Sequence, residues 1–166
     1  MEIKFIVDNN VGKLAKWLRT MGYDAPLFKE KDDGKMVKIA LSQDRVILTK
    51  DTQVMKRRAI TSGRLKAVLI KGDAPRTQLE QTANALNLDY QFRPFSICLE
   101  CNHNLVEKSK DEVRGLVPTH VFMTQSKYMQ CPSCQRIYWQ GTHWQAMSKE
   151  LKKLTESSGN EGGSRL

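Results

Sequence analysis

The sequence contains no long apolar run, no cysteine before residue 98 and only three histidines. Nothing in it approaches the roughly 20 consecutive apolar residues that a membrane-spanning helix needs. The first ten residues, MEIKFIVDNN, have an acid at the second position and too short an apolar stretch for a secretory signal peptide. We therefore expect a cytoplasmic protein with no membrane partner, whose 166 residues suffice for one domain and a small appendage.

Basic side chains outnumber acidic ones, with 27 Lys and Arg against 18 Asp and Glu, which gives a net charge of +9. A basic surface favours partners that carry phosphate, RNA above all, because neutralising phosphates releases counterions. A solvated face that only keeps the protein soluble explains the same charge equally well. The net charge alone leaves both interpretations open.

The first half of the chain alternates between strand and helix patterns. Strands are expected at 2–7, 45–49 and 65–70, and helices at 11–22, 33–43, 52–63 and 74–88. This alternation predicts an α/β domain over residues 1–95, with helices on both faces of a parallel sheet in three layers. A cysteine-bearing module is expected over 96–154, ending in a helix at 144–154, and the Ser/Gly-rich residues 155–166 are expected to be disordered.

Two C-x-x-C pairs, CLEC at 98–101 and CPSC at 131–134, contain all the cysteines. Disulfides are rare in a reducing compartment, whereas two thiolate pairs presented by tight turns complete a tetrahedral Zn²⁺ site. The 29 intervening residues leave room for an inserted hairpin or helix. Four thiolates leave no open coordination position, so we predict a structural zinc ion bound by Cys98, Cys101, Cys131 and Cys134.

An aromatic stretch, IYWQGTHW at 137–144, follows the second pair. RNA bases could stack on such rings if they are exposed. Alternatively, the rings cover the module or attach it to the sheet domain. The second interpretation is favoured, because small modules need large side chains to bury enough area.

Carboxylates follow two of the expected strands. Asp8 and Asp51 lie where the strands 2–7 and 45–49 end, and Asp33 begins a helix that can reach the same edge of the sheet. Converging carboxylates repel one another unless a cation lies between them, and oxygen ligands suit Mg²⁺ or Mn²⁺. Such an ion can promote hydrolysis of a phosphodiester. The same spacing also fits helix caps or turns, and Asp32 is an alternative to Asp33.

Basic side chains flank this edge on two expected helices. They could hold the backbone of a nucleic acid, although charged runs on helices are often only solvated. The candidates for RNA contact are Lys13, Lys16, Arg19, Lys50, Lys56, Arg57 and Arg58.

Several strings occur together in a distinctive order: FIVDNNVGKLAKWLRTMGYDA, RVILTKD, CLECN and CPSCQRIYWQGTHW. From about residue 3 to residue 150 the chain closely resembles the Mut-seven carboxy-terminal RNase family. The resemblance implies a PIN-like nuclease domain followed by a zinc ribbon, with the four cysteines at the ligand positions of the ribbon. It also implies a metal-dependent ribonuclease that holds Mg²⁺ or Mn²⁺ with Asp8, Asp33 and Asp51.

The sequence departs from the family's pattern at two places. Ile97 stands where an Arg is usual before the first cysteine, and no clear equivalent of a fourth acidic residue is found. We predict hydrolysis of RNA. The alternatives are a zinc-ribbon protein that binds RNA without cleaving it, and an interaction module regulated by a protein partner.

Overall fold

The computed structural model describes residues 2–163. A parallel sheet with the strand order β2-β1-β3-β4 forms the centre of the first half. The strands are β1 (Lys4–Asp8), β2 (Leu27–Phe28), β3 (Arg45–Thr49) and β4 (Ala67–Leu69). The α/β class predicted from the sequence is confirmed. The strand β2 was not predicted, because its two residues are too few for a recognisable pattern.

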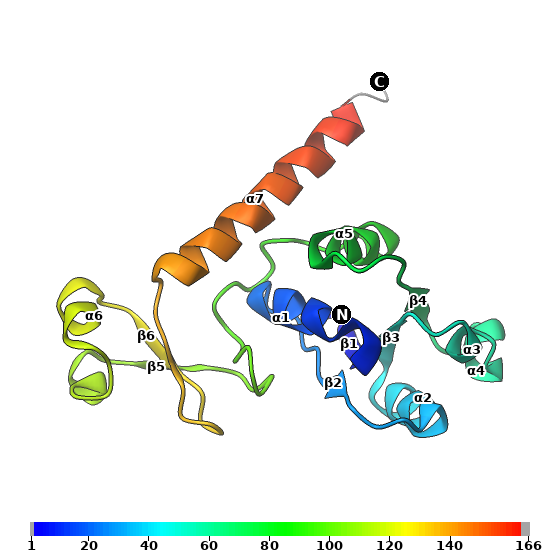
Figure 1. Ribbon diagram of the computed structural model, residues 1–166, viewed down its shortest axis with the longest axis horizontal. Coiled ribbons are helices and arrows are strands. Elements are labelled where there is room, and N and C mark those ends of the chain that lie inside the picture. The colour runs from blue at the N-terminus through cyan, green and yellow to red at the C-terminus, as the bar shows by residue number, and fades with distance from the viewer. Residues whose placement is uncertain (1, 164–166) are drawn as a thin grey trace.

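Helices cover both faces of this sheet (Figure 1). After the short 3-10 helix η1 (Asn9–Val11), α1 (Gly12–Thr20) packs with α5 (Pro75–Leu86) on one face. The other face is covered by α2 (Asp33–Gln43), α3 (Thr52–Met55) and α4 (Arg58–Thr61). The helix predicted over 52–63 is thus two short helices, which separate at the basic residues 56–57.

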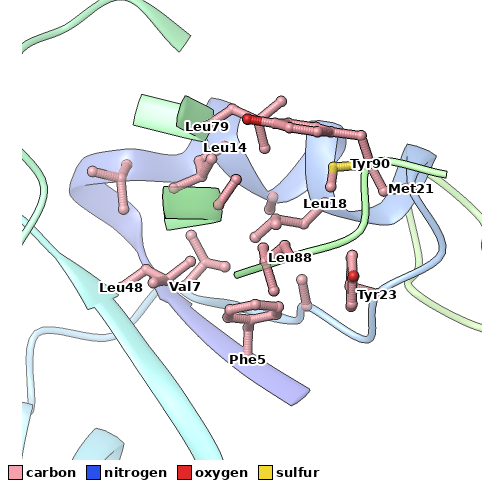
Figure 2. Packing of buried hydrophobic residues seen from close by; sticks show 14 of the residues in the cluster. Phe5, Val7, Leu14, Leu18, Met21, Tyr23, Leu48, Leu79, Leu88 and Tyr90 are labelled. Atoms are coloured by element: carbon pink, nitrogen blue, oxygen red, sulfur yellow. The ribbon is translucent and has the colours of Figure 1, made fainter. Parts of the chain in front are cut away.

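The strands supply alternate side chains to two hydrophobic cores. Phe5 and Val7 of β1 face α1 and α5, while Ile6 between them faces α2. Figure 2 shows the first core, where Phe5 and Val7 meet Leu14 and Leu18 of α1. Each such side chain contributes about 1.5–3 kcal/mol when it is fully buried. These cores fix the strand ends that carry the predicted site.

Gly22 ends the first helical segment in a conformation that other residues resist. Its φ is 93°, and a Cβ at this position would lie 2.2 Å from the carbonyl oxygen of Arg93. Only glycine fits so close an approach of two backbone segments. The chain can therefore turn sharply after α1 and return towards β2.

The second half contains an antiparallel sheet of β5 (Val106–Lys108), β6 (Tyr128–Gln130) and β7 (Ile137–Tyr138). Between β5 and β6 lie the 3-10 helix η2 (Asp111–Val113) and the helix α6 (Thr119–Thr124). Val113, Val121 and Tyr128 form the small core of this insertion. The insertion accommodates the long interval between the two cysteine pairs.

The last helix, α7 (Thr142–Gly163), is longer than the 144–154 expected and leads away from the antiparallel sheet (Figure 1). Leu151 and Leu154 join the core formed with α1 and α5. A helix anchored in this way can extend residue by residue, which accounts for its continuation into the expected tail. Residues 164–166 of that tail lie outside the described part, and the domain limits at 95 and 154 stay predictions. None of the helices within 2–163 has the length and apolarity to cross a bilayer.

Hydrogen bonds attach the second half to the first. The Asn102 side chain accepts from the Ala25 amide at 2.9 Å and donates to Asp24 Oδ1 at 2.7 Å. Arg45 forms an ion pair with the same carboxylate at 3.0 Å. Burial alone would raise the pKa of Asp24, but the hydrogen bonds from Arg45 and Asn102 outweigh it and lower the pKa. One carboxylate thus connects β3, the loop before β2 and the first cysteine turn.

Candidate functional site

The carboxyl ends of β1 and β3 lie side by side, since residues 4–7 of β1 pair in parallel with 45–48 of β3. Strand β2 lies on the other side of β1, so the connections that leave β1 and β2 run in opposite directions across the sheet. Ligand sites in open parallel sheets form at such a switch point, beyond the carboxyl ends of the strands. Asp8 ends β1 and Asp51 follows β3, so both predicted acids occupy this edge.

Thr49 connects these two acids. Its hydroxyl donates to Asp8 Oδ2 at 2.7 Å and accepts from the Asp51 backbone N–H at 3.0 Å. The Thr49 side chain is fully buried, so no water competes for these bonds. The Asp51 side chain in turn caps α3, accepting from the Gln53 amide at 2.8 Å. Both aspartates are thereby oriented by the residues around them.

Asn10 joins the two strand ends a second time. Its Oδ1 accepts from the Lys50 amide at 3.2 Å, and its Nδ2 lies 3.4 Å from Asp8 Oδ2. Neither Asn10 nor Thr49 was predicted from the sequence as part of the site. Both stand within two residues of a predicted acid, in the strings VDNN and TKD. This closeness in the sequence was the one feature that could have identified them as neighbours of the acids.

Asp33 completes the group as the first residue of α2. Burial raises its pKa, and the negative charges of Asp51 and Asp8 raise it further, so the three carboxylates are close enough to interact. The neighbouring Asp32 is engaged differently, because it caps α2 by accepting from the Lys35 amide at 3.0 Å. Asp51 caps α3 in the same way, so this bond leaves both candidates open, and Asp33 stays the predicted third acid of the edge.

The three carboxylates are less tightly grouped than a preformed metal cluster. Among residues 2–163, the four cysteines are the one group of potential metal ligands whose donor atoms all lie within 4.8 Å of one another. The acids have oxygen donors of the kind that Mg²⁺ and Mn²⁺ prefer, and such ions often take their remaining ligands from water and substrate phosphate. The arrangement is thus suited to an ion that binds together with a phosphate.

Two of the predicted cations, Arg57 and Lys50, lie close to the acidic edge. Arg57 lies beside the start of α2, since a Cβ at Gly34 would be 3.7 Å from Arg57 Nη1. Its positive charge lowers the pKa of Asp33, although burial and the charges of Asp51 and Asp8 raise this pKa by more. Lys50 forms an ion pair with Asp73. Lys56 and Arg58 are exposed on either side of Arg57.

The three predicted cations of α1 divide into two kinds. Lys13 and Lys16 are exposed. Arg19 is only 7% exposed and donates to the backbone oxygens of Ala25 at 3.0 Å and Leu99 at 2.6 Å. The expectation that Arg19 contacts RNA is therefore corrected: its guanidinium binds the protein's own backbone, because helical periodicity turns it towards the second half of the chain.

The four cysteines meet as predicted. All four sulfur atoms lie within 4.8 Å of one another, and Cys98 Sγ is 3.8 Å from Cys134 Sγ. Each pair lies in a tight turn in which the second cysteine's amide approaches the first sulfur, at 3.4 Å for Cys98 and 3.5 Å for Cys131. The residue after each pair has a positive φ, 64° at Asn102 and 67° at Gln135. This group could bind a metal ion such as zinc, and it is compatible with a zinc ribbon.

Tyr138 is part of the surroundings of the cysteines and was not identified as such from the sequence. Its hydroxyl lies 3.1 Å from Cys98 Sγ and accepts from the Leu99 amide at 3.2 Å. Burial raises the pKa of Cys98, but the hydrogen bonds from Tyr138 and from backbone amides outweigh it and bring the pKa to about 7. The lowered pKa favours the thiolate at Cys98, which is the form that binds metal, whereas the pKa of the neighbouring Cys101 is raised to about 12, chiefly by its hydrogen bond with Cys134.

Comparison with known proteins identifies one family. The family model described as the Mut7-C RNAse domain matches residues 3–151, which include both the acidic edge and the four cysteines. Neither the curated proteins nor the solved structures give a match to the chain. The matched region covers most of the 166 residues. The chain therefore belongs to the Mut7-C RNAse domain family.

Proposed function

We propose that the protein is a cytoplasmic ribonuclease that hydrolyses RNA phosphodiester bonds with Mg²⁺ or Mn²⁺ at the acidic edge. Asp8, Asp33 and Asp51 would be the protein ligands of the ion. The observation that carries this proposal is the approach of Asp8 at the end of β1, Asp33 at the start of α2 and Asp51 just beyond β3. Burial raises the pKa of Asp33, and the charges of Asp51 and Asp8 raise it further. The chemistry that a bound ion supplies here is activation of a water molecule and stabilisation of negative charge on the phosphate.

The residues around the acids would hold the ligand set in place. The hydroxyl of Thr49 fixes one oxygen of Asp8, which leaves the other carboxylate oxygen for an ion. Asp51 uses Oδ1 to cap α3 and retains Oδ2. Asn10 joins the two strand ends by accepting a hydrogen bond from the Lys50 amide. Hydrogen bonds of this kind, made to the residues that bind a metal ion, commonly orient those residues and adjust their affinity for the ion.

Cations near the edge would bind the substrate. Arg57 lies beside Asp33 and Lys50 beside Asp51, with Lys56 and Arg58 exposed nearby. Their positive charges attract the phosphate backbone and reduce the repulsion between RNA and the carboxylates.

The four cysteines are proposed to bind Zn²⁺ in a structural role. Their sulfur atoms fill a four-coordinate sphere, so no position remains for a reacting water. The ion would stabilise a module whose own hydrophobic core is small, with one cluster formed by Val113, Val121 and Tyr128.

Two alternatives follow from the same family membership. The chain could bind RNA without cleaving it. In that case the acids would serve only as helix caps, as Asp51 does when it accepts a hydrogen bond from the Gln53 amide. It could also act as an interaction module that becomes active only with a protein partner. RNA binding without cleavage would favour the first alternative, and cleavage only in the presence of a co-purifying protein would favour the second.

The deciding experiment is cleavage of labelled single-stranded and structured RNAs by zinc-loaded protein with Mn²⁺, Mg²⁺ or neither ion. The test variant is Asp51→Asn, because asparagine can still cap α3. The control is Asp44→Asn at the amino end of β3, where the φ of 54° suits asparagine. Ion-dependent cleavage by the native chain and the control, lost in Asp51→Asn, is the expected result. Equal cleavage by all three proteins would refute the proposed site.

A further inference from the structure

An apolar cavity of about 210 Å³ lies where α1, the cysteine module and α7 meet. Phe95, Tyr138, Trp139 and Trp144 form much of its wall. Trp144 packs edge-to-face against Phe95, with ring centroids 5.6 Å apart, so its ring is held in one orientation. The cavity is therefore lined by several aromatic rings, against which a flat aromatic group can stack.

A larger groove of about 820 Å³ adjoins this cavity and shares Tyr138, His143 and Met147 with it. Lys13 and Lys16 of α1 line one side of the groove, and Arg136 lines the other. One acid, Glu100, is also present, and Lys16 is paired with it at 3.1 Å. Three cations against one acid leave the groove positively charged.

One end of the groove lies at the starts of α1 and α5, the helices that follow β1 and β4. Gly12 and Pro75 line that end. Gly12 comes four residues after Asp8, directly beyond η1, and Pro75 follows Asp73, the partner of Lys50. A chain lying in the groove would thus extend from the carboxyl ends of the strands, along α1, to the aromatic cavity.

We propose that this groove binds single-stranded RNA, with its phosphates at Lys13, Lys16 and Arg136 and one unpaired base in the aromatic cavity. A basic track that leads to aromatic rings is the usual means of binding a single strand, whose bases are free to stack on side chains. In a duplex the bases are already stacked and paired, so a duplex cannot fill the cavity. The inference rests on the proposed function only for the direction of the strand towards the acids.

The test is a binding titration of a fluorescent uridine-rich single strand, and of the same strand in a duplex, at several salt concentrations. Zinc-loaded Asp51→Asn protein without Mg²⁺ or Mn²⁺ serves as the background, so that cleavage cannot interfere. Lys13→Glu is expected to weaken single-strand binding on the order of tenfold. It is also expected to reduce the slope of log affinity against log salt concentration by about one, which corresponds to one fewer ion released on binding. Trp144→Ala is expected to weaken binding by a similar factor with no change in salt dependence, because it removes stacking.

The matched control is Lys38→Glu, an equal change of charge on α2, which covers the opposite face of the sheet. It is expected to bind the strand almost as the background protein does. If Lys13→Glu and Trp144→Ala bind no more weakly than Lys38→Glu, or if the duplex binds as tightly as the single strand, the proposal is overturned.

Because Trp144→Ala removes a packing contact of Phe95, a second measurement avoids substitution altogether. A 4-thiouridine strand is photo-crosslinked to the background protein, and the attached peptides are identified by mass spectrometry. Crosslinks within residues 136–147 are expected, whereas crosslinks confined to α2 or α6 would overturn the proposal. RNA binding that depends on the groove, without cleavage by the native chain, would uphold this inference and refute the proposed nuclease. Cleavage by the native chain, with binding that does not depend on the groove residues, would refute this inference and uphold the nuclease.

Discussion

Arg19 of α1 donates a hydrogen bond of 2.6 Å from Nη1 to the carbonyl oxygen of Leu99, which stands between the first two cysteines. Its Nε donates to the Ala25 carbonyl at 3.0 Å, so one buried guanidinium connects the sheet domain, the loop before β2 and the first cysteine turn. The groove and the aromatic cavity both lie along this junction. The position of the cysteine module relative to the acidic edge therefore depends on Arg19.

Replacing Arg19 by Met is expected to lower the free energy of unfolding by about 2–4 kcal/mol, because one buried and one half-buried carbonyl lose a charged donor. Urea unfolding of the zinc-loaded protein measures the change. The control is Lys16→Met on the same helix, whose pair with Glu100 is solvent-exposed and is expected to be worth about 1 kcal/mol or less. Equal effects of the two substitutions would contradict the role assigned to Arg19.

Stability in acid should depend on Asp24. Its folded-state pKa is lowered, so its ionised form stabilises the fold above the unfolded-state pKa, and this contribution is lost as the pH falls through the folded value. Asp24→Asn is expected to be less stable than the native protein at pH 7, with the difference shrinking below about pH 4. Urea unfolding at a series of pH values measures this.

The control for Asp24 is Asp111→Asn, which removes the carboxylate of an exposed ion pair with Arg114. Exposed pairs contribute little, so its stability should follow the native curve at every pH. A constant difference between Asp24→Asn and the native protein down to pH 3 would show that the carboxylate charge is not what Arg45 and Asn102 stabilise.

Much of the sheet domain was predictable from local patterns. The helix at 33–43 and the strand at 45–49 have the predicted limits, because apolar periodicity marks the helix and a short apolar run marks the strand. The cysteine cluster was predictable as well, since C-x-x-C spacing is dictated by ligand geometry. These features depend on residues close together in the sequence.

Features that depend on distant residues were missed. The burial of Arg19 is determined by Leu99, 80 residues later, and a basic residue on a helix gives no local sign of such a partner. The same holds for Thr49, whose hydroxyl is satisfied by Asp8, 41 residues earlier. The aromatic stretch was expected mainly to cover or attach the module, and its Tyr138 does contact Cys98. The rings of this stretch also line a cavity that adjoins an open groove. This arrangement could be recognised only from the fold.

Loss of one cysteine should unfold the module. Cys131→Ser is expected to reduce bound zinc and to remove the protection of residues 98–138 from hydrogen exchange, since metal binding supplies much of the folding free energy of small zinc modules. Atomic absorption and hydrogen exchange measure the two effects. Ser133→Ala, in the same turn but without a sulfur ligand, is the control. Unchanged zinc content in Cys131→Ser would rule out the proposed ligand set.

Thr49 offers a test of how the acids are held. Thr49→Val keeps the shape of the buried side chain but removes the hydroxyl that accepts from the Asp51 amide and donates to Asp8. The free energy of unfolding is expected to fall by about 1–3 kcal/mol. The Mn²⁺ concentration needed for half-maximal cleavage is expected to rise roughly tenfold, as when residues that orient metal ligands are removed elsewhere.

Thr49→Ser distinguishes orientation of the acids from simple loss of packing. Serine restores the hydroxyl but lacks the methyl group, so it should recover the native Mn²⁺ requirement while losing some stability from the small cavity left behind. If the hydroxyl acts only structurally, Ser and Val would alter stability without altering the Mn²⁺ requirement. If it positions Asp8 and Asp51, the Mn²⁺ requirement follows the hydroxyl and the packing loss follows the methyl group, so the two effects separate.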